Sequence, residues 1–158
     1  MRRAVRRLAA VQIGQVMTQG AVSAAPDATL GDVAVLMRDR NVGSVVIVHH
    51  DRPVALITDR DVALAVGADG ADRGDPAGDH ATRPLVTGEA GMELEEAAAL
   101  MVQHRIRRLP VTDGDALAGI VTLDDLAVRT GDPTLAQQMT ADVTRAVVPG
   151  FFFHQRGG

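Results

Sequence analysis

The sequence contains no cysteine, no tryptophan and no tyrosine. Without cysteine the chain forms no disulfide and no thiolate metal site, which is typical of a reducing compartment. Its aromatic residues are confined to Phe151, Phe152 and Phe153. The core must therefore be built from aliphatic side chains. The chain also offers no aromatic platform on which single-stranded bases would stack.

Charge and hydropathy argue against two further classes of protein. The formal net charge is −4 at pH 7, so a bound phosphate would have to meet a local group of arginines. No apolar run reaches the roughly 18 residues of a transmembrane helix. Arg2, Arg3, Arg6 and Arg7 are not followed by the apolar stretch of a signal peptide. These arginines either belong to a solvated N-terminal helix or contact an acidic partner or a membrane surface. We expect a cytoplasmic protein with no nucleic-acid and no membrane partner.

The chain contains an internal repeat. Sliding the sequence along itself until Thr58 lies over Thr122 places residues 22–66 over residues 86–130 without a gap. Several superposed pairs are then identical, among them Leu30/Leu94, Ala34/Ala98, Leu36/Leu100, Met37/Met101, Thr58/Thr122 and Asp61/Asp125. Such a repeat usually means one supersecondary unit that needs its copy to bury an apolar face.

Each copy reads as strand, helix, strand, strand, helix, because apolar runs and helical spacing alternate in that order. In the first copy the expected strands are 21–23, 45–48 and 54–57, and the helix between the first two buries Leu30, Val33, Ala34 and Met37. In the second copy the expected strands are 85–86, 109–111 and 118–121. Its first helix buries Leu94, Ala97, Ala98 and Met101, and its closing helix spans 123–128. The predicted fold class is α/β, with two βαββα repeats packed with pseudo-twofold symmetry into one module.

This reading divides the chain into five parts. They are a basic N-terminal segment at 1–11, a repeat at 12–66, an exposed linker rich in Gly, Asp and Ala at 67–79, a repeat at 80–131, and a C-terminal extension at 132–158. The phenylalanines of the extension are either a small buried anchor or an exposed tail that meets a partner.

Thr58 and Thr122 each end a predicted strand and open a helix, with Asp61 and Asp125 three residues later. This spacing is that of a capping box, in which the threonine oxygen and the carboxylate satisfy free backbone N–H groups. Thr29, with an aspartate three residues on, shows the same spacing at an ordinary helix start.

The same residues also suit a ligand. A helix start reached from the end of a strand faces a crevice with free N–H groups and the positive end of the helix dipole. The carboxylates of Asp61 and Asp125 can each accept two hydroxyl hydrogen bonds from a ribose. Ile57 and Val121 would then form an apolar slot for a base. The spacing alone leaves both interpretations open.

At this point the chain resembles the CBS-domain family over about residues 12–131. The resemblance rests on Val16-Met17-Thr18, Ala81-Thr82, Pro-Asp-Ala-Thr-Leu at 26–30, His-Arg-Ile-Arg-Arg-Leu-Pro-Val at 104–111, and Gly-Ile-Val-Thr-Leu-Asp-Asp at 119–125. Two such repeats form a Bateman module. With Thr-Asp-Arg-Asp at 58–61 and Arg-Arg-Leu-Pro at 107–110, the chain is similar to the stand-alone actinobacterial CBS proteins and those of the hypoxic stress response.

The resemblance implies a regulatory protein, commonly a homodimer, that is not an enzyme and requires no cofactor. It implies an adenosine ligand (AMP, ADP, ATP or S-adenosylmethionine) in the cleft between repeats, and a change in module or dimer arrangement that an unidentified protein effector reads. The ligand-binding residues it implies are Thr58, Asp61, Thr122, Asp125, Ile57, Val121, Val22, Val86, Arg107 and Arg108. Since some family members have no known ligand, a ligand-free interaction or dimerisation protein remains the alternative.

Arg107 and Arg108 make the two halves unequal, because the repeat matches them to Gly43 and Ser44. The resemblance implies that basic residues at this strand start reach the phosphates of a ligand whose ribose is held by the other repeat. We therefore expect the cleft of Asp61 to be preferred. The alternative is that both arginines are part of a solvated strand edge.

His49 and His50 are the most metal-like pair in the sequence. Neighbouring residues of a strand point to opposite faces, so we expect the two imidazoles not to share an ion. No catalytic nucleophile and no acid–base pair stands in a convincing motif.

Overall fold

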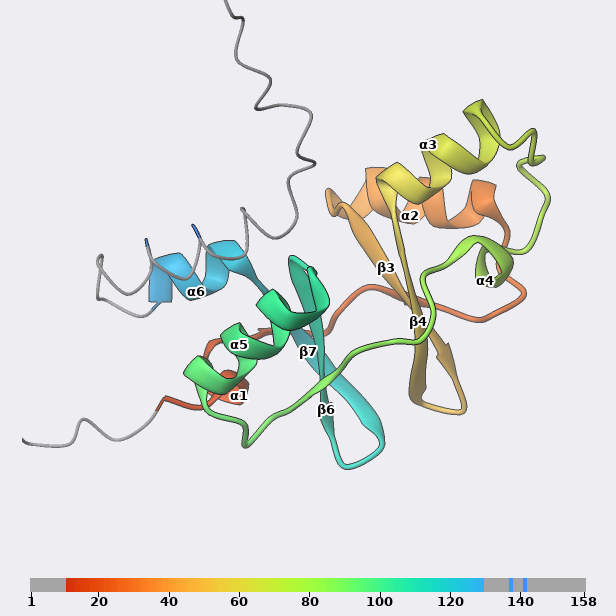
Figure 1. Ribbon diagram of the computed structural model, residues 1–158. Helices are drawn as coiled ribbons and strands as arrows, with labels where there is room; N and C mark the ends of the chain where they lie inside the picture. Colours follow the sequence, from red (N-terminus) through yellow and green to blue (C-terminus); the bar gives the residue numbers. More distant parts are fainter. Residues whose placement is uncertain (1–10, 130–136, 138–140, 142–158) are drawn as a thin grey trace, which may run out of the picture.

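The computed structural model describes residues 11–129, 137 and 141. Its elements in the first repeat are β2 (Ser23–Ala24), α2 (Leu30–Arg40), β3 (Ser44–His49), β4 (Arg52–Thr58) and α3 (Asp59–Gly67). Those of the second are β5 (Gly88–Glu89), α5 (Leu94–His104), β6 (Arg108–Asp113), β7 (Ala116–Thr122) and α6 (Leu123–Arg129). α1 (Ile13–Val16) and β1 (Thr18–Gln19) precede the elements of the first repeat, and α4 (Ala77–His80) precedes those of the second. The predicted α/β fold of two repeats is confirmed (Figure 1). The N-terminal arginines and the C-terminal phenylalanines lie outside the described residues.

The ends of the long helices follow from local sequence. At the start of α2, the hydroxyl oxygen of Thr29 accepts the Asp32 N–H at 3.1 Å, and the Asp32 carboxylate accepts the Thr29 N–H at 2.9 Å. At its end, Asn41 adopts a left-handed conformation with φ of 51°, which stops the helix. Arg105 ends α5 in the same way with φ of 54°. The two copies therefore stop at equivalent positions.

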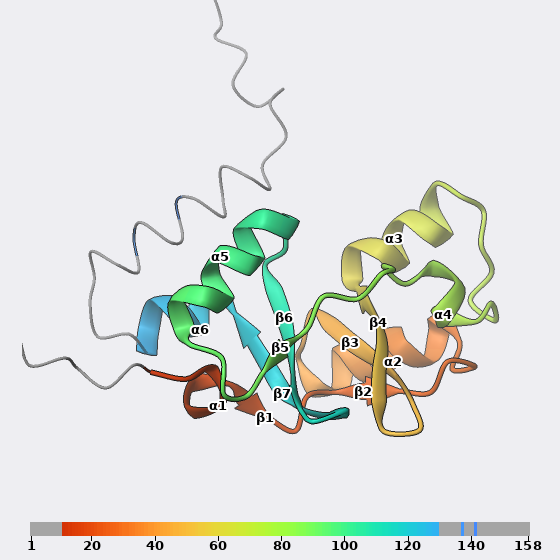
Figure 2. The ribbon, with the colours of Figure 1, turned by 60° about the horizontal axis from the view of Figure 1, so that its bottom comes forward.

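Each repeat builds its own sheet, and the segment that precedes the other repeat in the chain adds to it. One sheet has the order β1-β7-β6-β5 and the other β2-β3-β4. In the first, Thr18 of β1 lies opposite Ile120 of β7 in an antiparallel pair, and Figure 2 shows β1 beside β7. In the second, Thr82 bridges to Leu56 of β4, its N–H donating to the Leu56 carbonyl at 2.9 Å. This exchange ties the two repeats into one module.

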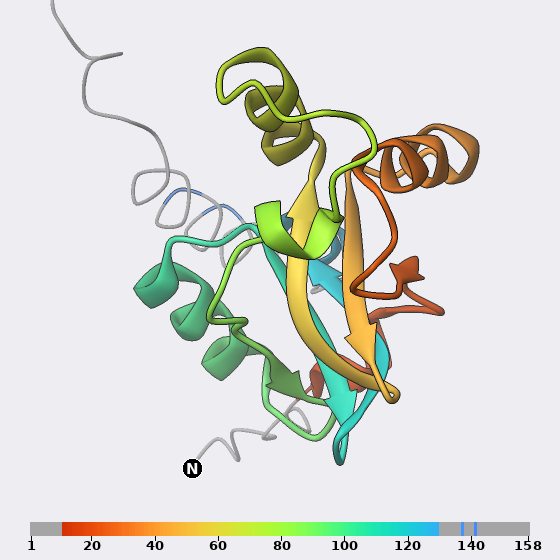
Figure 3. The same cartoon turned by 90° about the vertical axis from the view of Figure 1, so that its right-hand side faces the viewer.

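Two separate aliphatic cores lie between the sheets and the helices that cover their outer faces (Figure 3). The exchange of segments is visible here too, since Ile13 and Val16 of α1 pack in the core of the second repeat. Ala77 of α4 packs in the core of the first. Burial of each Val, Leu or Ile stabilises the fold by about 1.5–3 kcal/mol. The fully buried large side chains include Leu30, Val33, Val45, Ile47, Ile57, Met101, Leu109, Val111, Val121 and Leu126.

The prediction of an exposed linker at 67–79 is wrong for Ala77 and Gly78, which are buried, whereas most of the linker is exposed. There, α4 begins at Ala77, which is 0% exposed. The carbonyl of Asp75 accepts the Leu30 N–H at 2.9 Å, so the linker backbone satisfies one of the free donors at the start of α2. Composition alone did not reveal this, because the contact depends on where the chain folds back.

The helices are short. α2 and α5 have 11 residues each, and α1 and α4 have only four. A four-residue helix shows no periodicity, which is why neither α1 nor α4 was predicted. The first strand of each repeat also lies slightly later in the chain than predicted. Among the helices of the described part, none is long and apolar enough to cross a membrane.

Candidate functional site

Thr58 and Asp61 form a closed hydrogen-bonded pair where β4 ends and α3 begins. Oδ2 of Asp61 accepts the Thr58 backbone N–H at 2.8 Å and the Thr58 hydroxyl at 2.8 Å. Oγ1 of Thr58 accepts the Asp61 N–H at 3.2 Å. Both side chains are half-buried. The capping box that the spacing indicated is therefore present.

Thr122 and Asp125 repeat this geometry where β7 ends and α6 begins. Oδ2 of Asp125 accepts the Thr122 N–H at 2.8 Å and the hydroxyl at 3.0 Å, and Oγ1 of Thr122 accepts the Asp125 N–H at 3.3 Å. The two helix starts are thus nearly identical in their internal bonds. Any difference between the two halves must come from the residues around them.

The capping box leaves half of the Asp61 carboxylate available. A carboxylate can accept about four hydrogen bonds, and Thr58 supplies two, both to Oδ2. Among the described residues, no hydrogen bond reaches Oδ1. Two hydroxyls of a vicinal diol match this remaining capacity, and bonds to a charged acceptor are the stronger kind. Capping a helix and holding a diol are therefore compatible tasks for one side chain.

The two halves differ where Arg108 meets Gly43. An ideal Cβ on Gly43 would lie 2.8 Å from Nη2 of Arg108 and 3.5 Å from Oδ2 of Asp59. The guanidinium of the second repeat therefore lies against the bare Gly43 backbone of the first. The Gly43 carbonyl accepts the Asp59 N–H at 3.1 Å, which ties this point to the first residue of α3. The arrangement places a cation from one repeat at the helix start that carries Asp61 in the other.

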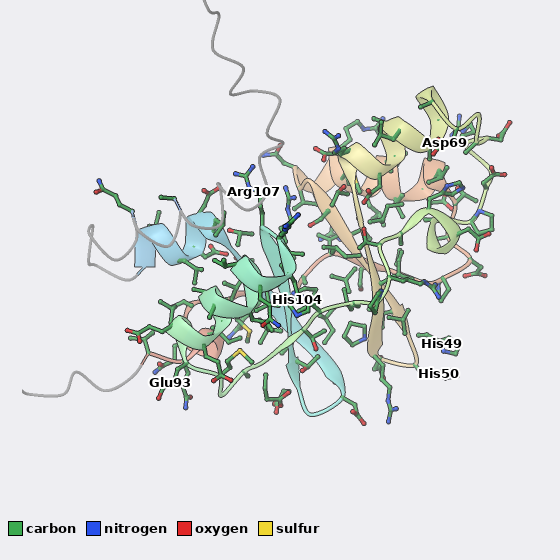
Figure 4. All side chains as sticks on the ribbon, in the orientation of Figure 1. His49, His50, Asp69, Glu93, His104 and Arg107 are labelled. Atoms are coloured by element: carbon green, nitrogen blue, oxygen red, sulfur yellow. The ribbon has the colours of Figure 1, made fainter. Side chains whose placement is uncertain are left out.

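Arg107 takes a different place. Its carbonyl accepts the Leu123 N–H at 3.2 Å at the start of α6, the contact that Gly43 makes with Asp59 in the first repeat. Its side chain is exposed, just before β6 (Figure 4). The described contacts bring Arg108, but not Arg107, to the first repeat. Arg107 lies in the bend just before β6, whereas Arg108 is the first residue of that strand.

The predicted apolar slot is wrong in its residues. Ile57 and Val121 are each 0% exposed and pack in the cores of their own repeats. Because side chains alternate along a strand, the strand residues on the same face as the two threonines are Leu56 and Ile120. Both are half-buried, and neither packs against a core cluster. Counting back by two from Thr58 would have found Leu56.

Val22 and Val86 lie at the edges of the two cores. Each is half-buried and packs against the core of its own repeat. The Val22 carbonyl accepts the Val46 N–H at 2.9 Å, which holds that segment beside β3. Their contribution to a cleft stays a prediction.

His49 and His50 differ from the sequence prediction in geometry. Their ring centroids lie 4.0 Å apart, instead of on opposite faces, and both are at the tip of the first hairpin (Figure 4). The reason is that His50 and Asp51 have φ of 50° and 62°, which makes a two-residue hairpin turn that ends the alternation. In the described part of the chain, no group of three or more His, Asp or Glu residues is arranged to hold a metal ion.

The pairing of two exchanged repeats with a Thr–Asp helix start in each corresponds to a known family. The family model described as CBS domain matches residues 13–68 and 77–129. The chain belongs to the CBS domain family.

Relatives extend over most of the chain. The CBS domain-containing protein YhcV of Bacillus subtilis is 42% identical over 112 residues, which are 71% of this chain and 80% of that one. The crystal structure of Hypoxic Response Protein I with two coordinated zinc ions is 30% identical, covers 75% of this chain and 98% of its own, and has a TM-score of 0.70. A CBS domain protein from Pyrobaculum aerophilum complexed with AMP is 25% identical, covers 83% and 99%, and has a TM-score of 0.72. The predicted resemblance to CBS pairs is confirmed.

Proposed function

We propose that this chain is a non-enzymatic regulatory module that binds an adenosine-type ligand (AMP, ADP, ATP or S-adenosylmethionine) in the cleft between its repeats. Binding changes the arrangement of the module or of its homodimer, and a protein effector reads the change. The observation that carries the proposal is the Arg108 guanidinium lying against Gly43, at the start of the helix that carries Asp61. That the Pyrobaculum aerophilum relative was solved with AMP supports the ligand class.

The geometry favours the Thr58–Asp61 cleft over its counterpart. In the first cleft, Oδ1 of Asp61 serves the ribose and Arg108 serves a phosphate, with the positive end of the α3 dipole beside both. In the second cleft, the position of Arg108 is taken by Ser44, which is 9% exposed and carries no charge. A phosphorylated ligand therefore gains a charge-assisted contact only in the first cleft.

A ligand-free interaction or dimerisation protein is the second candidate. One observation favours it: the Thr58–Asp61 pair already satisfies its own N–H groups as an ordinary capping box. On this reading Arg108 is a surface side chain that happens to cross between repeats. The two candidates differ in whether any adenosine compound stabilises the folded chain.

A thermal-shift panel with AMP, ADP, ATP, S-adenosylmethionine and adenosine separates them. A ligand at about 100 times its dissociation constant adds roughly 2.7 kcal/mol of stability, which raises Tm by roughly 5 to 11 °C for a chain of this size. We expect such a rise for at least one compound, its loss in Asp61→Ala, and its retention in Asp125→Ala. A flat panel at millimolar concentrations would support the ligand-free protein. If the rise in Tm were lost only in Asp125→Ala, the ligand would bind in the cleft of Asp125, and the assignment to Asp61 would be wrong.

A further inference from the structure

Asp59 is a second carboxylate at the start of α3, and it has no counterpart in the other half. The repeat matches it to Leu123, which is 3% exposed and part of the core of the second repeat. The side chain of Asp59 is exposed. An aspartate in the first turn favours any helix, but its charge at this position distinguishes the first half from the second.

The Asp59 carboxylate is oriented by the backbone. Oδ1 accepts the Arg60 N–H at 2.8 Å, which fixes the group at the first turn of the helix. Oδ2 lies on the other side, 3.5 Å from the ideal Cβ position of Gly43. Arg108 approaches the same position with Nη2 at 2.8 Å. Asp59 and Arg108 therefore face one point, although among the described residues the ion pairs within 4.0 Å are Arg38–Asp39 and Arg52–Asp115.

We propose that Asp59 determines the specificity of the Thr58–Asp61 site for phosphate charge, so that the site accepts an adenosine ligand with one phosphate in preference to a di- or triphosphate. The inference rests on the proposed function. A phosphate drawn to Arg108 comes close to Oδ2 of Asp59, and the repulsion grows with the charge of the ligand. A like charge placed against the wrong ligand is a common source of specificity.

The site therefore balances one attraction against one repulsion. Arg108 favours every phosphorylated ligand over adenosine, whereas Asp59 penalises each further negative charge. Since Asp59 is exposed and Arg108 is partly exposed, salt screens the effect. The preference is expected to be strongest at low ionic strength.

Isothermal titration with adenosine, AMP and ATP tests this on the wild-type chain and on Asp59→Asn, which keeps an oxygen for the Arg60 N–H. The expected gain in affinity in Asp59→Asn is absent for adenosine, about threefold for AMP and about tenfold or more for ATP, and it shrinks in high salt. Asp69→Asn is the matched control, because it makes the same change in net charge near the far end of α3 (Figure 4). It should leave all three affinities unchanged.

The outcomes distinguish this inference from the proposed function. If wild type and both variants bind none of the three compounds, the proposed function fails and this inference with it. If wild type binds but Asp59→Asn changes the AMP and ATP affinities by the same factor, or not at all, only the role of Asp59 is overturned. Circular dichroism verifies folding of each variant. Asp59→Ser also removes the charge and keeps a hydroxyl oxygen as an acceptor. Its gain in affinity should likewise be largest for ATP, smaller for AMP and absent for adenosine.

Discussion

At the scale of single residues, we propose that Asp61 has two tasks that use different oxygens. Its Oδ2 caps α3 through the N–H and the hydroxyl of Thr58. Its Oδ1 accepts no hydrogen bond from the described residues, and it is the oxygen proposed for the ligand. Thr29 and Asp32 make the same backbone bonds at α2. Arg73 of the linker lies near the start of that helix, but the described contacts bring no arginine of the second repeat there. The chain therefore contains its own reference for a capping box that lies away from the contact between Arg108 and Gly43.

Thr58→Ala and Thr29→Ala exploit this internal reference. Loss of an N-cap costs about 1 kcal/mol, so both variants should be destabilised to a similar extent in urea unfolding. Only Thr58→Ala should also weaken the binding of AMP, because it frees Asp61 from the orientation that the hydroxyl imposes. Equal AMP binding in the two variants would show that the Thr58 hydroxyl serves the helix alone.

At the scale of elements, the sequence predicted the helices and strands whose apolar pattern is local. The 3.6-residue spacing identified α2 and α5, and the apolar runs identified β3, β4, β6 and β7, each within a few residues of its observed bounds. The exchange of α1 and α4 between repeats was not predicted, because it depends on long-range pairing that no periodicity records.

The candidate site was predicted in part, for related reasons. The Thr–Asp pairs follow from spacing, and their hydrogen bonds are as a capping box requires. The apolar slot was assigned to Ile57 when strand alternation pointed to Leu56. The contact of Arg108 with Gly43 joins different repeats. The sequence could therefore show that the two repeats differ in charge, but not that Arg108, and not Arg107, reaches the first repeat.

Asp32 at the start of α2 gives the fold a predictable response to acid. Hydrogen bonds from the Thr29 backbone and side chain, and then the charge of Arg73, hold the pKa of Asp32 below its ordinary value of 3.8. A carboxyl with a lowered pKa in the folded state stabilises the fold above that ordinary value, and the contribution disappears as pH falls through the folded pKa. Asp32→Asn should therefore be less stable than wild type at pH 7, with the difference shrinking below pH 3.8.

Urea midpoints measured from pH 7 down to pH 3 would reveal this dependence. Asp69→Asn, exposed in the linker, is the control for the change in net charge. A difference between Asp32→Asn and wild type that stays constant over the whole pH range would contradict the role given to the carboxylate.

At the scale of the whole molecule, the two repeats are joined at several places. The exchanged segments pair β1 with β7 and Thr82 with β4. At the hairpin tips, Arg52 and Asp115 form an ion pair of 2.6 Å, and the Leu117 N–H donates to the Asp51 carbonyl at 3.1 Å. A rearrangement on ligand binding must therefore either keep these contacts and move the module as one body, or break them.

The helical surface offers a place for the proposed dimer. Leu64 on α3 is 46% exposed, and Val128, its equivalent on α6, is 79% exposed. We propose that these two side chains, at equivalent positions of the two repeats, bury against a second copy. We predict that Leu64→Glu shifts the chain from dimer to monomer in size-exclusion chromatography with light scattering. Val11→Glu alters an apolar side chain of similar exposure (42%) that precedes α1, and it should remain dimeric. A dimer that persists in Leu64→Glu would place the interface elsewhere.

The most direct test of the central claim is the stoichiometry of AMP binding by isothermal titration. We predict one AMP per chain for the wild type, none for Asp61→Ala, and one for Asp125→Ala, because only the first cleft combines a free carboxylate oxygen with Arg108. Absence of binding heat over a range of temperatures, or binding that survives Asp61→Ala, would contradict the claim that this cleft is an adenosine-phosphate site.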